Sequence, residues 1–206
     1  MIKHIFHLLL FSGFVVIAGC VTFDAPTNYD LLHGPEKGLL VVSVRHTNVR
    51  WVDLFYRNTK TRAGGFIRTR SKTIPMDWEN PDGRLIVAEL PAGEYEIYRW
   101  ESTDGQVFIN AADSFSIPFE VLPGRATYIG GIVIAISMEN YRGSWGSKLR
   151  KVGFQIGDQS ERDLEIFLNR YQRLSVNDVT VKIATFNQDC LTTLVTKCHN
   201  STPLRE

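Results

Sequence analysis

The chain has 206 residues, of which 44% are hydrophobic and 22% charged, a composition typical of folded globular proteins. Its 23 basic and 22 acidic residues give a formal net charge of +1 at pH 7. Nucleic-acid-binding proteins usually carry a basic excess, so this charge argues against nucleic acid as a partner. The length suits one domain with a sizeable core, with or without a small appendage.

The amino terminus has the features of an export signal. A basic residue, Lys3, precedes an apolar run from Ile5 to Ala18. The run is shorter than the roughly 20 apolar residues that a membrane-spanning helix needs. A short apolar run after a basic start is typical of the central region of a secretory signal peptide. Residues 1–19 are therefore predicted to be a signal peptide.

The apolar run ends in Ile-Ala-Gly-Cys at 17–20, where an aliphatic residue and two small residues precede Cys20. This pattern resembles the lipobox of bacterial lipoproteins. The resemblance implies that the Cys20 thiol receives a diacylglyceryl group, that a peptidase cuts before it, and that a fatty acid such as palmitate can acylate the new amino group. Two or three acyl chains would keep the protein on a membrane, since one chain binds only reversibly. In the alternative interpretation, Val15 to Cys20 is a buried strand, whose position straight after a basic start is then unexplained.

The residue after the cysteine bears on the choice of membrane. In lipoproteins of enteric bacteria, an aspartate at that position favours retention in the inner membrane. Val21 stands there in this chain. The resemblance therefore implies an outer-membrane protein that faces the periplasm, if the source is Gram-negative.

Residues 20–37 combine the predicted lipid site with a polar, turn-rich stretch that contains Pro26, Gly34 and Pro35. We interpret this stretch as a flexible tether. By the scaling of flexible chains, such a tether would hold the domain about 20 to 25 Å from the bilayer. In the alternative interpretation, part of the stretch, from Tyr29 to His33, packs on the domain.

Residues 38–137 alternate between apolar and polar side chains with the period of two that is typical of half-buried strands. Every second residue from Phe115 to Val121 is apolar, and this segment ends at a Pro-Gly turn. The segment 127–137 is nearly all apolar, as expected for a central strand covered on both faces. Short strands at this spacing predict a mainly β fold, an antiparallel β-sandwich. The other predicted strands are 38–46, 50–58, 64–71, 83–91 and 93–102.

Two motifs in this region are more specific than alternation. Leu-Pro-Ala-Gly-Glu-Tyr-Glu-Ile at 90–97 and Pro-Gly-Arg-Ala-Thr-Tyr-Ile-Gly at 123–130 each place a tyrosine shortly after a proline and a glycine. Proline and glycine form a tight corner, and the tyrosine puts its ring into the core with its hydroxyl available for a backbone partner. The pair of motifs resembles the transthyretin-like or carboxypeptidase-regulatory-like sandwiches of exported bacterial lipoproteins. The resemblance covers residues 39–137 and implies a fold, not an activity.

A candidate binding surface lies between Arg57 and Lys72, where the chain has basic residues and no acid. If this stretch is a hairpin with Gly64 and Gly65 near its bend, Arg68 and the two basic residues after it project from one side. Such a fork suits anionic lipid headgroups, a cell-wall polymer or an acidic partner protein. The alternative is a charged edge strand that prevents aggregation. The basic residues are Arg57, Lys60, Arg62, Arg68, Arg70 and Lys72.

Residues 138–206 are interpreted as an extension that packs on the sandwich. Apolar residues from Leu164 to Leu174 recur at three- and four-residue steps, and Ser160 stands in position to cap, which predicts an amphipathic helix at about 161–174. Its apolar stripe indicates packing on the body, with binding of a partner as the alternative. One more strand is predicted at 179–186.

Two cysteines remain at the carboxyl end once Cys20 is lipidated. Because an exported protein folds in an oxidising compartment, Cys190 and Cys198 are predicted to form a disulfide that pins the terminal tail. A metal site that includes the adjacent His199 is the alternative, although the spacing lacks the four ligands of a structural zinc site.

No catalytic motif is visible elsewhere. The sequence lacks an H-E-x-x-H pair, a G-x-S-x-G elbow and a phosphate-binding glycine loop. Glu94 and Glu96 share one face of a predicted strand and could bind a cation, but solvated acids are more common there. We therefore predict no enzyme activity, no metal and no cofactor besides the covalent lipid. Trp78, Trp100 and Trp145 are either aromatic anchors or core residues.

These features predict a membrane-anchored envelope lipoprotein that acts as a non-catalytic binding or structural module. The alternative is a component or accessory of a multiprotein envelope or secretion assembly. A hydrolase or ligand carrier with an unfamiliar site is a third hypothesis. The expected partners are the membrane, through the lipid anchor, and an envelope protein or a cell-wall polymer.

Overall fold

A computed structural model describes residues 20–21, 24–31, 34, 36–47, 51–69, 83–103, 108–110, 115–140, 147–185 and 196–198. The predicted signal peptide lies outside these residues, as do Arg70, Lys72, Trp78, Trp145, Cys190 and His199. The disulfide and the carboxyl-terminal metal alternative therefore stay predictions. Within the described residues, no helix combines the length and the hydropathy that crossing a membrane requires.

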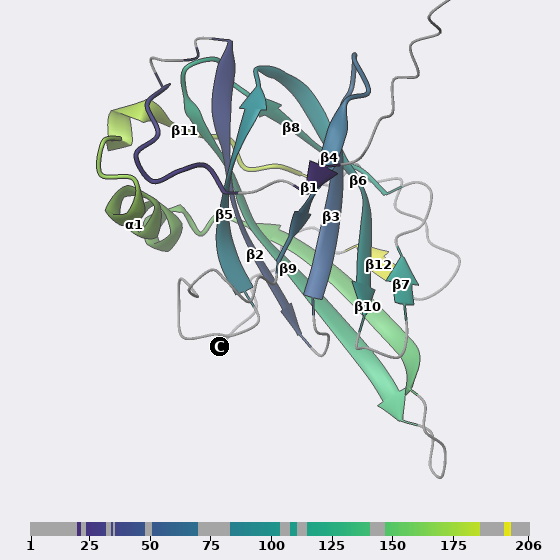
Figure 1. The fold of residues 1–206 in the computed structure, drawn as a ribbon. Coiled ribbons are helices and arrows are strands. Elements are labelled where there is room, and N and C mark those ends of the chain that lie inside the picture. The colour runs from purple at the N-terminus through teal and green to yellow at the C-terminus, as the bar shows by residue number, and fades with distance from the viewer. Residues whose placement is uncertain are drawn as a thin grey trace, which may run out of the picture.

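The described strands form two sheets that pack face to face, and one helix lies on the outer side of the second sheet (Figure 1). Sheet A has the order β1-β4-β3-β6-β7, and β8 also pairs with β6. Its strands are β1 (Cys20–Val21), β3 (Trp51–Asn58), β4 (Gly64–Arg68), β6 (Gly93–Thr103), β7 (Phe108–Asn110) and β8 (Ile117–Val121).

Sheet B has the order β12-β10-β9-β2-β5, and β11 also pairs with β9. Its strands are β2 (Lys37–Thr47), β5 (Gly83–Pro91), β9 (Ala126–Asn140), β10 (Ser147–Gly157), β11 (Val179–Val181) and β12 (Thr196–Cys198). The helix α1 (Ser160–Arg170) and the short 3-10 helix η2 (Val176–Asp178) stand between β10 and β11 in the chain.

Both sheets are mixed, so the expectation of a purely antiparallel sandwich is wrong. Four neighbouring pairs are parallel: β1 with β4, β2 with β9, β9 with β11 and β10 with β12. Parallel neighbours need a long connection. Between β2 and β9 the chain forms β3 and β4 in sheet A, β5 in sheet B, and then β6 to β8 in sheet A. The coarser prediction of a mainly β chain with two packed sheets and one helix is confirmed.

The main core fills the space between the sheets. Trp100 on β6 and Phe154 on β10 have ring centroids 5.2 Å apart, and Phe115 lies 5.1 Å from Phe154. Trp100 is therefore a core residue. The predicted alternation from Phe115 to Val121 is confirmed, because every second residue of that segment is buried.

A second apolar cluster covers the outer side of sheet B, beneath α1. Because of this cover, β9 is buried on both faces from Ala126 to Ile132, the first half of the predicted central strand, whereas Ala135 farther along is exposed. The cluster includes Leu39, Val41, Leu85, Val87, Tyr128, Phe167 and Tyr171.

The helix α1 packs on sheet B with its apolar stripe, as predicted, and Phe167 is fully buried there. It ends at Arg170, before the end of the predicted range 161–174. The start also differs from the prediction. Ser160 does not cap the helix with its side chain; instead its backbone N–H donates to Oδ1 of Asp158 at 2.8 Å.

The strand predicted at 179–186 is short, because β11 ends at Val181. The chain then continues beside β9 through two backbone hydrogen bonds. The N–H of Lys182 donates to the carbonyl of Tyr128 at 2.8 Å, and that of Ala184 to Ile129 at 2.9 Å.

Residues 24–31 lie on the outer side of sheet B beside α1, so the expectation of a flexible tether is wrong for them. The N–H of Ala25 donates to the carbonyl of Val87 at 2.7 Å, and the hydroxyl of Tyr171 donates to the carbonyl of Ala25 at 2.8 Å. Tyr29 is buried, in agreement with the alternative that this part packs on the domain. The segment covers part of the edge of β5, which would otherwise present unpaired backbone groups.

Candidate functional site

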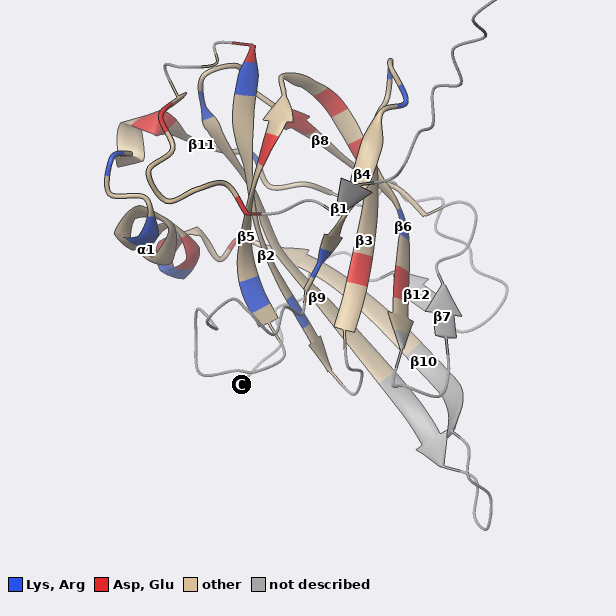
Figure 2. Cartoon of the chain, in the orientation of Figure 1, with Lys and Arg blue, Asp and Glu red and all other residues tan. Residues whose placement is uncertain are grey.

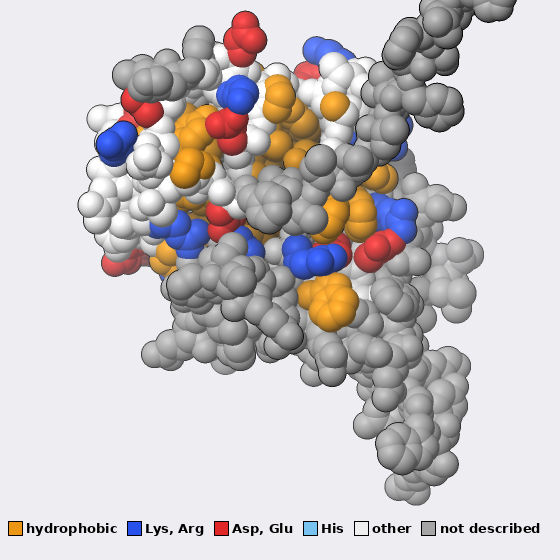
Figure 3. All heavy atoms as spheres, viewed as in Figure 1, with side chains coloured by type: hydrophobic (Ala, Val, Ile, Leu, Met, Phe, Trp, Pro, Cys, Tyr) orange, Lys and Arg blue, Asp and Glu red, His pale blue; other side chains and the backbone are white. Residues whose placement is uncertain are grey.

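The outer side of sheet A carries aromatic and basic side chains close together. Phe55 on β3 and Phe66 on β4 have ring centroids 5.4 Å apart. Around them lie Arg57 of β3 and Tyr98 and Arg99 of β6, and all five line a shallow hollow of about 430 Å³. We call these five residues the sheet A face. Figure 3 shows hydrophobic side chains there, over β3, β4 and β6, with basic and acidic side chains beside them.

A β-bulge places both Tyr98 and Arg99 on this face. Phe55 pairs with Arg99 and Tyr56 pairs with Ile97, so Tyr98 is an extra residue in β6. In a regular strand, two neighbouring side chains point to opposite sides of the sheet, and a bulge changes this alternation locally. As a result, two consecutive side chains line the same hollow.

Guanidinium groups lie over the aromatic rings of the face. Arg57 is 4.3 Å from the ring centroid of Tyr98, and Arg99 is 5.1 Å from that of Phe55. Arg68, at the end of β4, is 5.3 Å from the ring centroid of Phe66. Such cation–π contacts contribute about 0.5 to 1 kcal/mol each at exposed sites, so they hold the arginine side chains over the rings.

Arg57 and Arg62 share the carboxylate of Glu96 on β6. Arg57 Nε donates to Glu96 Oε1 at 2.7 Å, and Arg62 Nη1 lies 3.8 Å from the same oxygen. Burial alone would raise the pKa of Glu96, but hydrogen bonds from Arg57 and Ser116 outweigh it and hold the pKa below its ordinary value. Glu96 is thus an arginine partner here, and not part of the cation site considered for Glu94 and Glu96.

Arg68 and Lys60 also have acidic partners. Arg68 Nε and Nη2 donate to the two carboxylate oxygens of Asp53 at 2.8 and 2.7 Å, and this hydrogen bonding raises the pKa of Arg68. Lys60 Nζ lies 3.5 Å from Glu94, with both side chains well exposed. The stretch 57–72 contains no acid of its own, and the fork itself stays a prediction, because Arg70 and Lys72 lie outside the described residues. Acids that are distant in sequence stand beside the basic residues on neighbouring strands (Figure 2).

The predicted hairpin is confirmed, because β3 and β4 are antiparallel, and its bend lies immediately before the two glycines. The turn spans residues 59–63, and Asn58 Oδ1 accepts hydrogen bonds from two turn N–H groups at 3.0 and 2.9 Å. Arg62 has a φ of 63°, in the left-handed region. Gly64 instead begins β4, where a Cβ atom would lie 2.1 Å from the carbonyl oxygen of Tyr56.

Cys20, the predicted lipid site, belongs to a strand at the edge of sheet A. In the parallel pair of β1 with β4, Cys20 lies opposite Gly65 and Val21 opposite Phe66. Neighbouring strands in a sheet are about 4.8 Å apart. The backbone of Cys20 is therefore one strand spacing from a residue that lines the hollow of the sheet A face.

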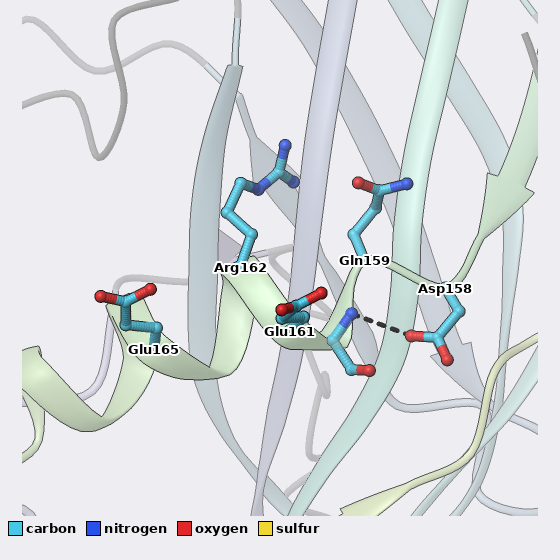
Figure 4. Close-up of a pocket in the computed structure, with 6 residues that line it drawn as sticks. Asp158, Gln159, Glu161, Arg162 and Glu165 are labelled. Atoms are coloured by element: carbon cyan, nitrogen blue, oxygen red, sulfur yellow. Dashed lines mark hydrogen bonds between the residues drawn. The ribbon is translucent and has the colours of Figure 1, made fainter. Parts of the chain in front are cut away.

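A second hollow, a cleft of about 560 Å³, lies at the start of α1. It is lined by Asp158, Gln159, Ser160, Glu161, Arg162 and Glu165, whose side chains appear in Figure 4. Hydrogen bonds from Ser160 hold the pKa of Asp158 below its ordinary value. Arg162 Nη2 donates to the buried Asp163 at 2.6 Å, so its charge is already paired. The lining contains no histidine, lysine or cysteine, and we assign no chemistry to it.

The described part of the chain contains no group of three or more His, Cys, Asp or Glu residues in positions to hold a metal ion. The sheet A face includes Phe55, Phe66, Tyr98 and Arg99, which the prediction of a basic surface did not name. The three aromatic residues could have been found from the sequence. Phe55, Phe66 and Tyr98 are aromatic residues at positions next to buried ones in strands, so they fall on the outward side.

No protein-family model and no curated protein matches this chain. Among solved structures, the chain is similar to a leucine-rich repeat protein from Bacteroides thetaiotaomicron, with 16% sequence identity and a TM-score of 0.33. The similarity covers 50% of this chain and 14% of that chain. Similarity at this level supports no conclusion about fold or function.

Proposed function

We propose that this chain is a lipid-anchored protein of the bacterial cell envelope that acts as a non-catalytic binding or structural module. The observation that carries the proposal is the Ile-Ala-Gly-Cys sequence at 17–20, which stands between a signal-like segment and a β-rich body. Attachment through Cys20 follows from the lipobox resemblance. Val21 after the cysteine favours the outer membrane.

We also propose that the two sheets form a transthyretin-like sandwich. The corner motif at 90–97 supports this, because the hydroxyl of Tyr95 donates to the carbonyl of Pro91 at 2.8 Å, the backbone partner that the motif predicts. The second motif places Tyr128 in an apolar cluster, although its hydroxyl donates to Asp163 at 2.7 Å. The layers β4-β3-β6-β8 and β5-β2-β9-β10 are consistent with this proposal.

The sheet A face is the surface that we propose for binding. It combines exposed guanidinium groups with aromatic rings, a chemistry that suits an anionic or amphipathic partner. The cleft at the start of α1 is a weaker candidate for such a partner, because its lining has three acids, one basic side chain and no aromatic ring.

The test of the proposed function is metabolic labelling with a palmitate analogue, followed by membrane fractionation. We expect the intact chain to carry the label and to sediment with membranes, and the Cys20→Ser variant to lose both properties. Cys198→Ser is the matched control, since it removes a different cysteine and should keep the label. Label on Cys20→Ser would overturn the proposal.

A further inference from the structure

We propose that the sheet A face lies on the phospholipid headgroups of the membrane that holds the anchor, with α1 directed away from the bilayer. This inference rests on the proposed function, because it takes Cys20 as the site of the lipid. It differs from the tether interpretation, in which the domain stands well above the membrane.

The position of β1 limits the distance between the domain and the bilayer. Cys20 pairs with Gly65 in β4, and Asp24 is already bound to the domain, with an Oδ2 to Arg84 Nη2 distance of 2.5 Å. The chain from Cys20 to Asp24 therefore cannot act as a long spacer. A lipid on Cys20 enters the bilayer within about one strand spacing, roughly 5 Å, and one side-chain length of β4. The surface next to β4 is consequently the one nearest to the headgroups.

The chemistry of the face suits a headgroup layer. Arg57 donates a hydrogen bond from Nε to Glu96, and Arg99 donates one from Nη2 to Glu101. Within the described residues, the other N–H donors of these two arginines have no recorded protein acceptor. They can donate to phosphate oxygens, which guanidinium groups bind with charge-assisted hydrogen bonds. The rings of Tyr98 and the phenylalanines fit the level where aromatic side chains collect in membrane proteins.

The start of α1, on the opposite side of the molecule, carries a cluster of exposed acids. The helix α1 packs on the outer side of sheet B, so it lies across the sandwich from the sheet A face (Figure 1). Asp158, Glu161 and Glu165 are exposed there and form the acidic rim of the cleft in Figure 4. Anionic lipids repel these carboxylates. An orientation with α1 on the membrane is therefore disfavoured.

The experiment is site-specific photocrosslinking of the intact, lipidated protein. The photoreactive residue p-benzoylphenylalanine replaces Tyr98 in one variant and Glu161 in the matched control. Each purified protein is reconstituted in vesicles of phosphatidylethanolamine and phosphatidylglycerol with a trace of fluorescent phospholipid, and is then irradiated. We expect at least fivefold more fluorescent lipid on the Tyr98 variant than on the Glu161 variant. A third variant carries the photoreactive residue in place of Phe66 on β4 and should give as much lipid adduct as the Tyr98 variant. It shows whether the result depends on misfolding of one variant.

Flotation of the same vesicles separates this inference from the proposed function. If the proteins float but lipid adducts are equal at both positions, or are confined to Glu161, the orientation is wrong and the anchor stands. If the unsubstituted chain neither floats nor carries palmitate, the proposed function fails and this inference fails with it. Irradiation of whole cells adds one further outcome. Adducts of the Tyr98 variant with another protein, in place of lipid, would overturn the headgroup assignment.

Discussion

Asp163 shows how one buried acid joins the helix to the sandwich. The hydroxyl of Tyr128 donates to Asp163 Oδ2 at 2.7 Å, and Arg162 donates Nε and Nη2 to Oδ1 at 2.8 and 2.6 Å. Burial, reinforced by the hydrogen bond to Asp163, raises the pKa of Tyr128 far above its ordinary value, so this tyrosine stays a neutral donor. A fully buried carboxylate is tolerated because both of its oxygens accept hydrogen bonds.

Asp163→Ala is expected to lower the free energy of unfolding by about 3 kcal/mol, because it leaves the Tyr128 hydroxyl and the Arg162 guanidinium without their acceptor. Urea unfolding followed by circular dichroism measures the loss. Glu165→Ala, on the exposed side of the same helix, is the control and should change stability by less than about 0.5 kcal/mol. Equal losses in both variants would contradict the role of Asp163.

Buried tyrosines should make the fold sensitive to alkaline pH. Burial is the main cause that raises the pKa of Tyr171 from 10.0 to about 12. The folded chain then holds this proton more tightly than the unfolded chain. The contribution to stability is therefore complete below pH 10 and falls as the pH rises toward 12, by about 1.4 kcal/mol per pH unit for one group.

Urea unfolding at a series of pH values between 9 and 12 tests this expectation. Tyr171→Phe should reduce the fall of the free energy of unfolding with alkaline pH by the contribution of one titrating group. It should also cost about 1 kcal/mol at neutral pH, because the hydrogen bond to the carbonyl of Ala25 is lost. Phe167→Leu disturbs the same cluster without removing a titrating group and should keep the slope. An identical slope in wild type and Tyr171→Phe would show that this tyrosine does not titrate as proposed.

At the scale of elements, the segment 24–31 acts as a clamp on the edge of sheet B. Asp24 Oδ2 accepts a hydrogen bond from Arg84 Nη2 at 2.5 Å, and Oδ1 accepts one from the N–H of Val87 at 3.3 Å. The side chains of Asp24 and Arg84 are only 15% and 10% exposed, so this ion pair is largely removed from water. The clamp therefore joins residues 24–31, near the amino end of the domain, to β5 and α1.

Asp24→Ala should open this clamp and lower the free energy of unfolding by about 3 kcal/mol, because it leaves the buried Arg84 without its anion. Limited proteolysis should also cut within residues 24–31 faster than in wild type. Lys37→Ala is the control, since it breaks an exposed pair with Glu89 at 2.5 Å and should cost less than about 1 kcal/mol. Unchanged proteolysis in Asp24→Ala would mean that the segment is held by its apolar contacts alone.

The whole molecule has two unlike sides across the sandwich. The sheet A face carries rings and arginines, and the outer side of sheet B carries α1 with exposed acids. Cys20 stands at the edge of the first side. The proposed anchor and the proposed membrane-facing surface therefore act together, and either one alone would leave the orientation of the domain undetermined.

Membrane sorting is a property of the whole molecule that one residue should control. In an enteric host, Val21→Asp is expected to move most of the protein from the outer to the inner membrane, since aspartate after the lipidated cysteine favours retention. Val21→Ala is the control and should stay in the outer membrane. Sucrose-gradient separation of the two membranes measures the distribution. An unchanged distribution of Val21→Asp would remove the support for outer-membrane sorting by this rule.

Much of the local structure was predictable because it depends on neighbours in sequence. The alternation from Phe115 to Val121 and the apolar stripe around Phe167 follow from strand and helix periods, and burial confirms both. The ends of elements were less predictable. The helix ends at Arg170, just before Tyr171, whose hydroxyl donates to the distant Ala25, and β11 ends at Val181 although the chain still bonds to β9 after it.

The candidate surface was predictable only in part. The basic residues are visible in the sequence, but Glu96 meets Arg57 because antiparallel β3 and β6 bring them together in register. Likewise, Arg99 reaches the face through a bulge, and a bulge depends on the pairing of two strands. The periodicity of one segment does not show how two strands pair, so it predicts neither the register nor the bulge.

The sequence by itself predicts the lipid site at Cys20, because the pattern that resembles a lipobox is a short run of neighbouring residues and does not depend on the fold. It also predicted the helix and most of the long strands, since both depend on local periods, but it did not predict β10, which lies in the segment interpreted as an extension. Only the tertiary structure decided that Cys20 stands beside Gly65, that residues 24–31 are not a tether, and that arginines, acids and rings share one face. Those facts depend on strand order and register, which are set by contacts between residues far apart in the chain.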